Sequence, residues 1–145
     1  MSSFGFMLLM FLGGISVAVQ PSINARLAEK VGALESATIS FAVGTLALLV
    51  VAFVAGRGSF RGLANVQGWE LTGGFLGAFF VSLTIIAVPR IGTAAVMAAL
   101  IAAQLATGVL LDHYGIFGFK AIPLDLKRSI GICLLLAGSI LVFRR

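Results

Sequence analysis

The sequence predicts an all-α membrane protein with five transmembrane helices. Of its 145 residues, 60% are hydrophobic and only 10% are charged, and the mean hydropathy is +1.14. A soluble domain carries charge at roughly a quarter of its positions, so this composition excludes an ordinary cytosolic enzyme, a disordered chain and a secreted disulfide scaffold. The apolar residues form continuous runs near the length of a bilayer span and do not alternate with polar residues as barrel strands would. Each run is therefore expected to be a helix.

Charged residues bound each apolar run and divide the chain into its expected helices. The runs cover residues 4–24, 36–55, 71–89, 91–111 and 129–143. The third and fourth runs are separated only by a corner at Pro89 and Arg90. The run 129–143 is the shortest, and we expect the basic residues beside it to snorkel from both ends and complete the span.

The chain is expected to form one transmembrane domain over residues 1–145. No basic residue precedes Arg26, and the first run is long enough to span, so it is expected to be a retained helix rather than a removed signal peptide. The longest connections, 56–68 and 112–126, are too short to hold a folded soluble domain. All function is therefore expected inside the membrane.

The basic residues divide equally between the two sides of the membrane. With five spans, one side holds Arg57, Arg61, Lys120, Lys127 and Arg128, and the other holds Arg26, Lys30, Arg90, Arg144 and Arg145. The positive-inside rule then gives no preferred orientation. One explanation is that the boundaries are misplaced by a residue or two, although every one of these residues lies outside the runs. The other is dual topology, in which copies insert both ways and pair as an antiparallel homodimer.

One face of the first run carries candidates for a substrate path. Ser16, Gln20 and Asn24 recur every four residues, and Pro21 interrupts the run. Proline lacks an N–H, so the carbonyl of Val17 loses its usual helical partner. Amide side chains and a free carbonyl in hydrocarbon favour a wall of a solute pathway, and Gln20 and Asn24 are therefore candidate residues. The alternative is that these amides only bond a neighbouring helix or lie in the interface.

Two further runs carry polar residues. Gln104, with Thr107 three residues on, is the most deeply placed amide and is a third candidate for the path, although glutamine also joins helices without binding a solute. Ser36, Ser40 and Gly44 form a four-residue stripe on the second run that is typical of helix packing. We include Ser40 with the path candidates.

No charged residue lies deep in any run, which limits the chemistry available. Asp112 and His113, at the end of the fourth run, are candidates for a proton-sensitive gate because histidine titrates near neutral pH, and the alternative is a solvated loop start. Glu70 stands at a helix N-terminus, where its charge favours the helix dipole. Metal-ligand spacing, an activated nucleophile and a phosphate-binding loop are all missing from the sequence, so we expect no enzyme, metal or cofactor. The scattered cations also argue against a nucleic-acid partner.

Three stretches of the sequence resemble the small five-span YdcZ-like branch of the drug/metabolite transporter superfamily. The stretches read QPSINARLAEKVGALESATISFAVGTLAL, GGFLGAFFVSLTIIAVPRIGTAAVMAALIAAQL and LLDHYGIFG. Their most specific pieces are Gln20 with Asn24, Pro89 with Gly92, Gln104, and the string Asp112-His113-Tyr114-Gly115.

The resemblance implies a multi-pass exporter of the bacterial inner membrane, whose five helices form half of a ten-helix inverted-repeat fold. It also implies that Gln20, Asn24 and Gln104 line the central path, with Asp112 and His113 at its mouth. Two oppositely inserted copies would reproduce such an inverted repeat, on which alternating-access transporters are built. The expected function is secondary transport of a small metabolite or cation by an antiparallel homodimer in the lipid bilayer. The alternatives are a dual-topology ion or solute channel and one half of a heterodimeric transporter.

Overall fold

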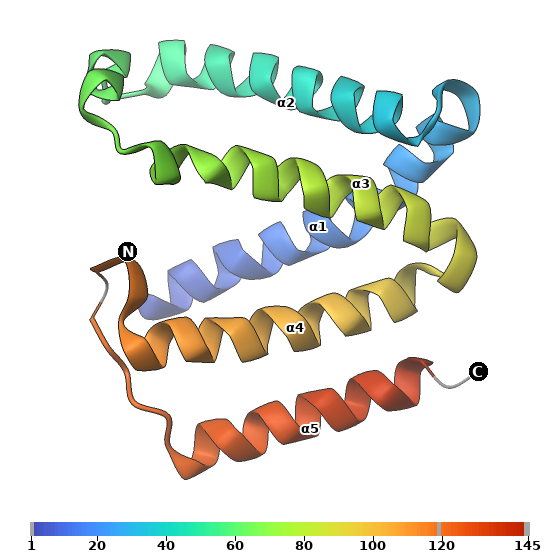
Figure 1. The fold of residues 1–145 in the computed structure, drawn as a ribbon, viewed down its shortest axis with the longest axis vertical. Coiled ribbons are helices and arrows are strands. Elements are labelled where there is room, and N and C mark those ends of the chain that lie inside the picture. Colours follow the sequence, from blue (N-terminus) through green and yellow to red (C-terminus); the bar gives the residue numbers. More distant parts are fainter. Residues whose placement is uncertain (1, 119, 144–145) are drawn as a thin grey trace. The chain divides into compact units, whose positions relative to one another are not determined.

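The computed structural model describes residues 2–118 and 120–143, which are almost entirely helical and contain no strand (Figure 1). The α-helices are α1 (Ser3–Val31), α2 (Ala33–Ala55), α3 (Gly73–Ile91), α4 (Thr93–Tyr114) and α5 (Leu126–Phe143). The connections hold three short 3-10 helices, η1 (Phe60–Asn65), η2 (Gly68–Thr72) and η3 (Ile116–Gly118). The all-α prediction is therefore confirmed.

Four helical segments of the described chain are long and apolar enough to cross a membrane. They are Ser3–Val31, Ala33–Ala55, Gly68–Ile91 and Thr93–Tyr114. The helix α5 has 18 residues, and Lys127 and Arg128 lie in its first turn. The count of five spans and the single domain over residues 1–145 stay predictions.

Some helices end beyond the predicted apolar runs, because charged residues that are good helix formers continue them. The helix α1 continues past residue 24 to Val31 through an Ala-, Leu- and Lys-containing segment, because helix propensity does not require an apolar side chain. The predicted corner at Pro89 and Arg90 is wrong, since both residues lie inside α3. A proline in the last turn removes one hydrogen bond without turning the chain. The corner lies at Gly92, whose φ of 85° suits glycine.

A single glycine also joins α1 to α2. Gly32 has φ 99° and ψ 157°, and its N–H donates to the carbonyl of Ala28 at 2.9 Å. Its own carbonyl accepts from the N–H of Ser36 at 3.0 Å. A Cβ atom at this position would collide with the carboxylate of Glu35. Glycine therefore permits a turn so short that α1 and α2 must fold back as a hairpin.

The described contacts divide the chain into two compact units, with the boundary between Arg90 and Ile91. In the N-terminal unit, α3 packs against the turn end of the hairpin through Ala37, Val81 and Ile85, which form its buried core. Toward the other end α1 and α2 diverge (Figure 1). Over residues 4–20, all of which the structure describes, no side chain of α1 is buried. The hairpin is therefore tight at its turn and open beyond it.

In the C-terminal unit, α4 and α5 lie side by side (Figure 1). The Ser139 hydroxyl on α5 lies 2.9 Å from the main-chain carbonyl of Ala98 on α4 and 2.9 Å from that of Leu135 on its own helix. Asp125 caps the N-terminus of α5, since its side-chain Oδ1 accepts a hydrogen bond from the N–H of Arg128 at 2.7 Å. Small residues on α4 thus allow a close approach of the two helices.

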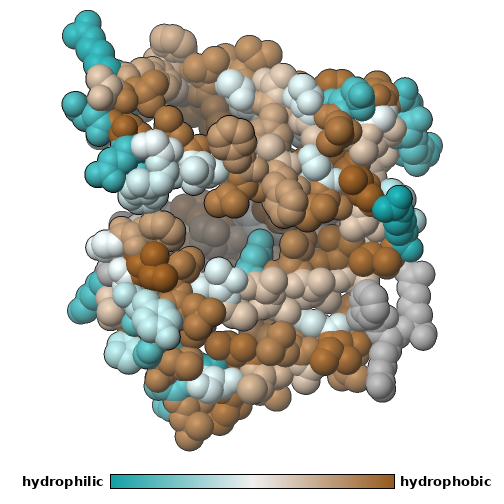
Figure 2. All heavy atoms as spheres, viewed as in Figure 1, coloured by the Kyte–Doolittle hydropathy of each residue, from teal (hydrophilic) through white to brown (hydrophobic). Residues whose placement is uncertain are grey.

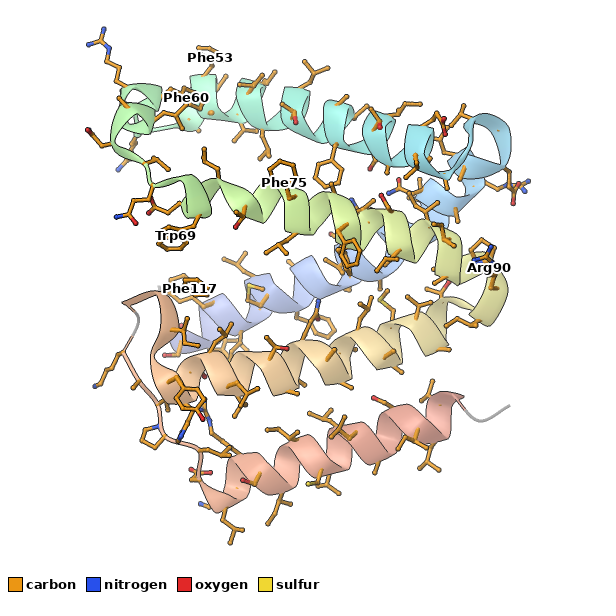
Figure 3. The ribbon with its side chains drawn as sticks, viewed as in Figure 1. Phe53, Phe60, Trp69, Phe75, Arg90 and Phe117 are labelled. Carbon is orange, nitrogen blue, oxygen red and sulfur yellow. The ribbon has the colours of Figure 1, made fainter. Side chains whose placement is uncertain are left out.

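The surface of the helices suits a bilayer. Figure 2 shows hydrophobic residues over the middle of the helices and hydrophilic residues gathered toward their ends. Phe53 and Phe60 lie at the end of α2 and in η1, and Trp69 lies at the entry to α3 (Figure 3). Tryptophan concentrates at the level of the lipid headgroups because its ring is amphipathic, so Trp69 suits a position at the membrane interface in the connection between α2 and α3.

Candidate functional site

A cleft of about 180 Å³ opens where α1 and α2 diverge. Gln20 lines it from α1, and the residues from α2 are Ser40, Phe41, Gly44, Thr45 and Leu48. The structure thus brings together Gln20 and Ser40, which the sequence placed on separate polar stripes. The sequence analysis did not single out Phe41 and Thr45, because nothing in their spacing along the helix distinguishes them. They line the cleft because α1 diverges from α2.

One helical turn closer to Gly32, a buried hydrogen bond ties the two helices together. The Ser36 hydroxyl donates to the main-chain carbonyl of Asn24 at 2.7 Å. Ser36 is 0% exposed and Asn24 is 5% exposed. Residues four apart share a helix face, so pairing Asn24 with Ser36 brings Gln20 opposite Ser40 one turn away. This bond therefore sets the register in which the cleft forms.

The side chain of Asn24 differs from the other buried polar groups of the described residues. Its amide nitrogen Nδ2 is buried and has no hydrogen-bond partner there. Leaving a buried donor unpaired costs about 1–3 kcal/mol, and native structures contain few such groups. Asn24 thus holds an unused donor beside the cleft.

Gln104 lies exposed on α4, in the C-terminal unit. That Gln104 lines the same substrate path as Gln20 and Asn24 stays a prediction.

Asp112 and His113 lie in the last turn of α4 and hold the connection to α5. Asp112 pairs with Arg128 at 3.0 Å, and its main-chain carbonyl accepts from the N–H of Ile122 at 2.8 Å. His113 accepts from the N–H of Leu124 through Nδ1 at 3.1 Å, which places the ring proton of the neutral imidazole on Nε2. These contacts give both residues a structural role, and their role as a gate stays a prediction.

The remaining charged residues near the helix ends take part in local structure. The Glu70 carboxylate accepts from the N–H of Gln67 at 2.7 Å and completes a capping box at η2, as its position at a helix N-terminus predicted. Arg26 pairs with Glu29 on α1. Within residues 2–118 and 120–143, no three His, Cys, Asp or Glu side chains gather where they could hold a metal ion.

Comparison with known proteins agrees with these features. Residues 5–141 match a family described as "Putative inner membrane exporter, YdcZ". The chain is 32% identical over 137 residues to the inner membrane protein YdcZ of Escherichia coli (strain K12), a match that covers 91% of this chain and 90% of that protein. No solved structure matches the chain significantly. The protein is therefore a multi-pass protein of the bacterial inner membrane, and the chain belongs to the YdcZ family of inner-membrane exporters.

Proposed function

We propose that the protein is a secondary transporter that exports a small metabolite or cation as an antiparallel homodimer with dual topology. Membership of an inner-membrane exporter family supports export. The observation that carries the proposal further is the cleft that Gln20 lines from α1 and that Ser40 and Thr45 line from α2. Polar side chains that line a cavity at membrane depth mark solute pathways, because hydrocarbon penalises them elsewhere.

The proposal of an antiparallel dimer rests on the distribution of the basic residues and on the number of membrane spans. We assign α5 as the fifth span, so that the two termini lie on opposite sides of the membrane. The ten Lys and Arg residues then divide five and five between the sides. Two oppositely inserted copies would supply ten helices related as an inverted repeat, half of them from each copy.

The remaining candidates take their place in this transporter. We also assign Gln104 on α4 to the substrate path, and Asp112 with His113 to a gate. Support for the gate comes from the His113 Nδ1 atom, which accepts from the N–H of Leu124. Protonation of Nδ1 would remove that acceptor and free the connection between α4 and α5.

The path is tested by comparing the small molecules that cells release into the medium. We expect a solute to accumulate with the wild type and to fall to the level of empty cells with Gln20→Leu. The matched control is Thr38→Ala, since the Thr38 hydroxyl bonds the carbonyl of Leu34 within α2 and is not part of the cleft lining. Equal release by Gln20→Leu, at equal protein in the membrane, would contradict the assignment of the path.

The rate at which the same solute crosses a membrane distinguishes a transporter from a channel. In proteoliposomes that contain the purified protein, a secondary transporter gives saturable exchange. A conductance far above carrier rates would contradict secondary transport and favour the channel.

A further inference from the structure

We propose that an exposed face of α1 binds an anionic phospholipid, with an acyl chain along its apolar residues and the phosphate on Arg26 and Lys30. A groove of about 580 Å³ lies on this face. The described residues that line it are Val19, Ser22, Ile23, Arg26, Leu27 and Lys30. The groove shares no lining residue with the cleft that holds Gln20, so this binding does not depend on the proposed transport function.

The groove combines an apolar stripe with a polar one. Residues four apart lie on the same face of a helix, one turn above the other. At this spacing, one stripe consists of Val19, Ile23 and Leu27, and the other consists of Ser22, Arg26 and Lys30. Val19 is 50% exposed and Ile23 is 62% exposed, so the apolar stripe is open to a ligand. It runs along α1 beside the stripe that ends in two cations.

The length of α1 places these stripes at the right depth for a lipid. A helix of 29 residues is about 43 Å long, whereas the hydrocarbon core of a bilayer is about 30 Å thick. The last turns of α1, which carry Arg26 and Lys30, therefore extend to the level of the headgroups. The apolar stripe from Leu27 back to Val19 covers about 12 Å toward the membrane centre. An acyl chain in one leaflet, which spans about 15 Å, can follow it.

The charge of the groove is complementary to a phosphate group. Among the described residues that line it, Arg26 and Lys30 are basic and none is acidic. Glu29, one position before Lys30, pairs with Arg26 through Nη1 alone. A guanidinium carries five N–H donors, so Arg26 can also bind a phosphate oxygen. In the part of the chain that the structure describes, Lys30 forms no ion pair. The groove therefore favours an anionic headgroup over a zwitterionic one, whose own ammonium group would lie among these cations.

Native mass spectrometry of the protein purified in detergent measures the binding of added lipids. Phosphatidylglycerol should bind more tightly than phosphatidylcholine with the same acyl chains. Arg26→Gln with Lys30→Gln should weaken phosphatidylglycerol about thirtyfold, the factor that corresponds to ~2 kcal/mol for two cations. Arg57→Gln with Arg61→Gln is the matched control, because it removes two cations at the same spacing from outside the groove. Equal binding of the two lipids, or equal weakening by the two double variants, would overturn the proposal.

A second pair of variants tests whether the groove holds the acyl chain. Ile23→Ala should weaken phosphatidylglycerol about fourfold, the factor for the apolar contact of one methylene group. Ile140→Ala on α5 is the control, because Ile23 and Ile140 are 62% and 61% exposed and only Ile23 lines the groove. Inorganic phosphate, which lacks a chain, should not displace the lipid at equal concentration.

Three results would overturn the proposal through this second pair. Unchanged lipid binding by Ile23→Ala would show that the groove does not hold the chain. Displacement by inorganic phosphate would show a site for the anion alone. Loss of the protein dimer, with lipid binding kept, in both Ile23→Ala and the Arg26 and Lys30 double variant would show that a second copy covers this face.

Discussion

The hydroxyl of Ser36 has more influence on the fold than its size suggests. It donates to the main-chain carbonyl of Asn24 at 2.7 Å, in a position from which water and lipid are excluded. Side chains of serine bond across helices in membranes because hydrocarbon offers no other partner. Through the four-residue repeat, this one contact aligns Gln20 with Ser40 and so positions both walls of the cleft.

Ser36→Ala should therefore lower the free energy of unfolding by about 0.6–1.5 kcal/mol, the range for one interhelical hydrogen bond. Thr38→Ala is the matched control, because the Thr38 hydroxyl bonds the Leu34 carbonyl in its own helix and is exposed. Unfolding in mixed micelles of denaturing and mild detergent, followed by Trp69 fluorescence, measures both variants. Equal losses for the two would show that the Ser36 bond does not hold the helices together.

Of the residues that line the cleft, the sequence analysis named Gln20 and Ser40 as candidates for the substrate path. Gln20 and Ser40 were found because polar residues at helical spacing stand out in an apolar run. The sequence also identified Asn24, but it could not show that the carbonyl of this residue is bonded while its amide nitrogen is left unpaired. That distinction depends on how two helices approach each other, which residue spacing along one helix does not specify.

Among the helices, α3 supports the wall of the cleft from behind. A Cβ atom built at Gly77 would lie 3.3 Å from Cζ of Phe41, whose ring also lines the cleft. Gly77 therefore permits α3 to pack closely against α2 at this point. Gly74, one turn earlier, has no neighbour within 4 Å of such an atom.

Gly77→Leu should destabilise the protein by about 1–3 kcal/mol, the usual cost of inserting carbon atoms into a packed contact. It should also reduce export, since the displaced ring of Phe41 would enter the cleft. Gly74→Leu adds the same side chain and the same gain in helix propensity without the clash, and it should fold and export normally. Similar behaviour of the two variants in unfolding and release assays would contradict the packing of α3 against Phe41.

The connection between α4 and α5 depends on Arg128. Its guanidinium pairs with Asp112 at 3.0 Å and reaches the carbonyl of Ile122 at 3.4 Å. Arg128→Gln should speed hydrogen exchange at the amides of Ile122 and Leu124, which bond Asp112 and His113. The effect on global stability should stay below about 1 kcal/mol, because the pair is partly exposed.

Lys127→Gln removes the same charge from the adjacent position and provides the control for this experiment. Exchange should then match the wild type at both amides. If Arg128→Gln leaves exchange unchanged, the ion pair does not order the connection, and a gate that includes Asp112 loses its support.

The sequence predicted the α-helices correctly, but it misplaced several of the residues at which they begin or end. Apolar runs identify the part of a helix that meets lipid, whereas α1 continues to Val31 through residues that carry charge. The turn was placed at Pro89 because proline disrupts helices, yet α3 continues through Pro89 and the helical conformation is interrupted where φ is positive, at Gly92. Hydropathy therefore predicted the central parts of the helices, proline position misplaced one break, and glycine conformation determines where the helices are interrupted.

For the whole molecule, composition and family similarity established a multi-pass protein of the inner membrane. The antiparallel dimer stays a proposal, which rests on the equal division of the basic residues between the two sides of the membrane. Because a few basic residues in the loops decide the orientation of a membrane protein, removing two of them from one side should change the ratio of the two orientations.

Arg57→Gln with Arg61→Gln should therefore bias insertion toward the orientation with the N-terminus outside, because three cations would remain on that side against five on the other. Lys30→Gln with Arg90→Gln removes two cations from the opposite side and should produce the reverse bias. Terminal labelling on intact cells measures the ratio of orientations. An unchanged ratio in both double variants would contradict control by charge balance.

The antiparallel homodimer is tested most directly by the sidedness of the two termini in a chain with all of its basic residues. Single cysteines placed at Ser3 and after Arg145, each in a Cys133→Ala background, are treated on intact cells with a reagent that cannot cross the membrane. Dual topology predicts labelling of about half of the molecules at each end. Complete labelling at one end and none at the other would show a fixed orientation and contradict the antiparallel homodimer.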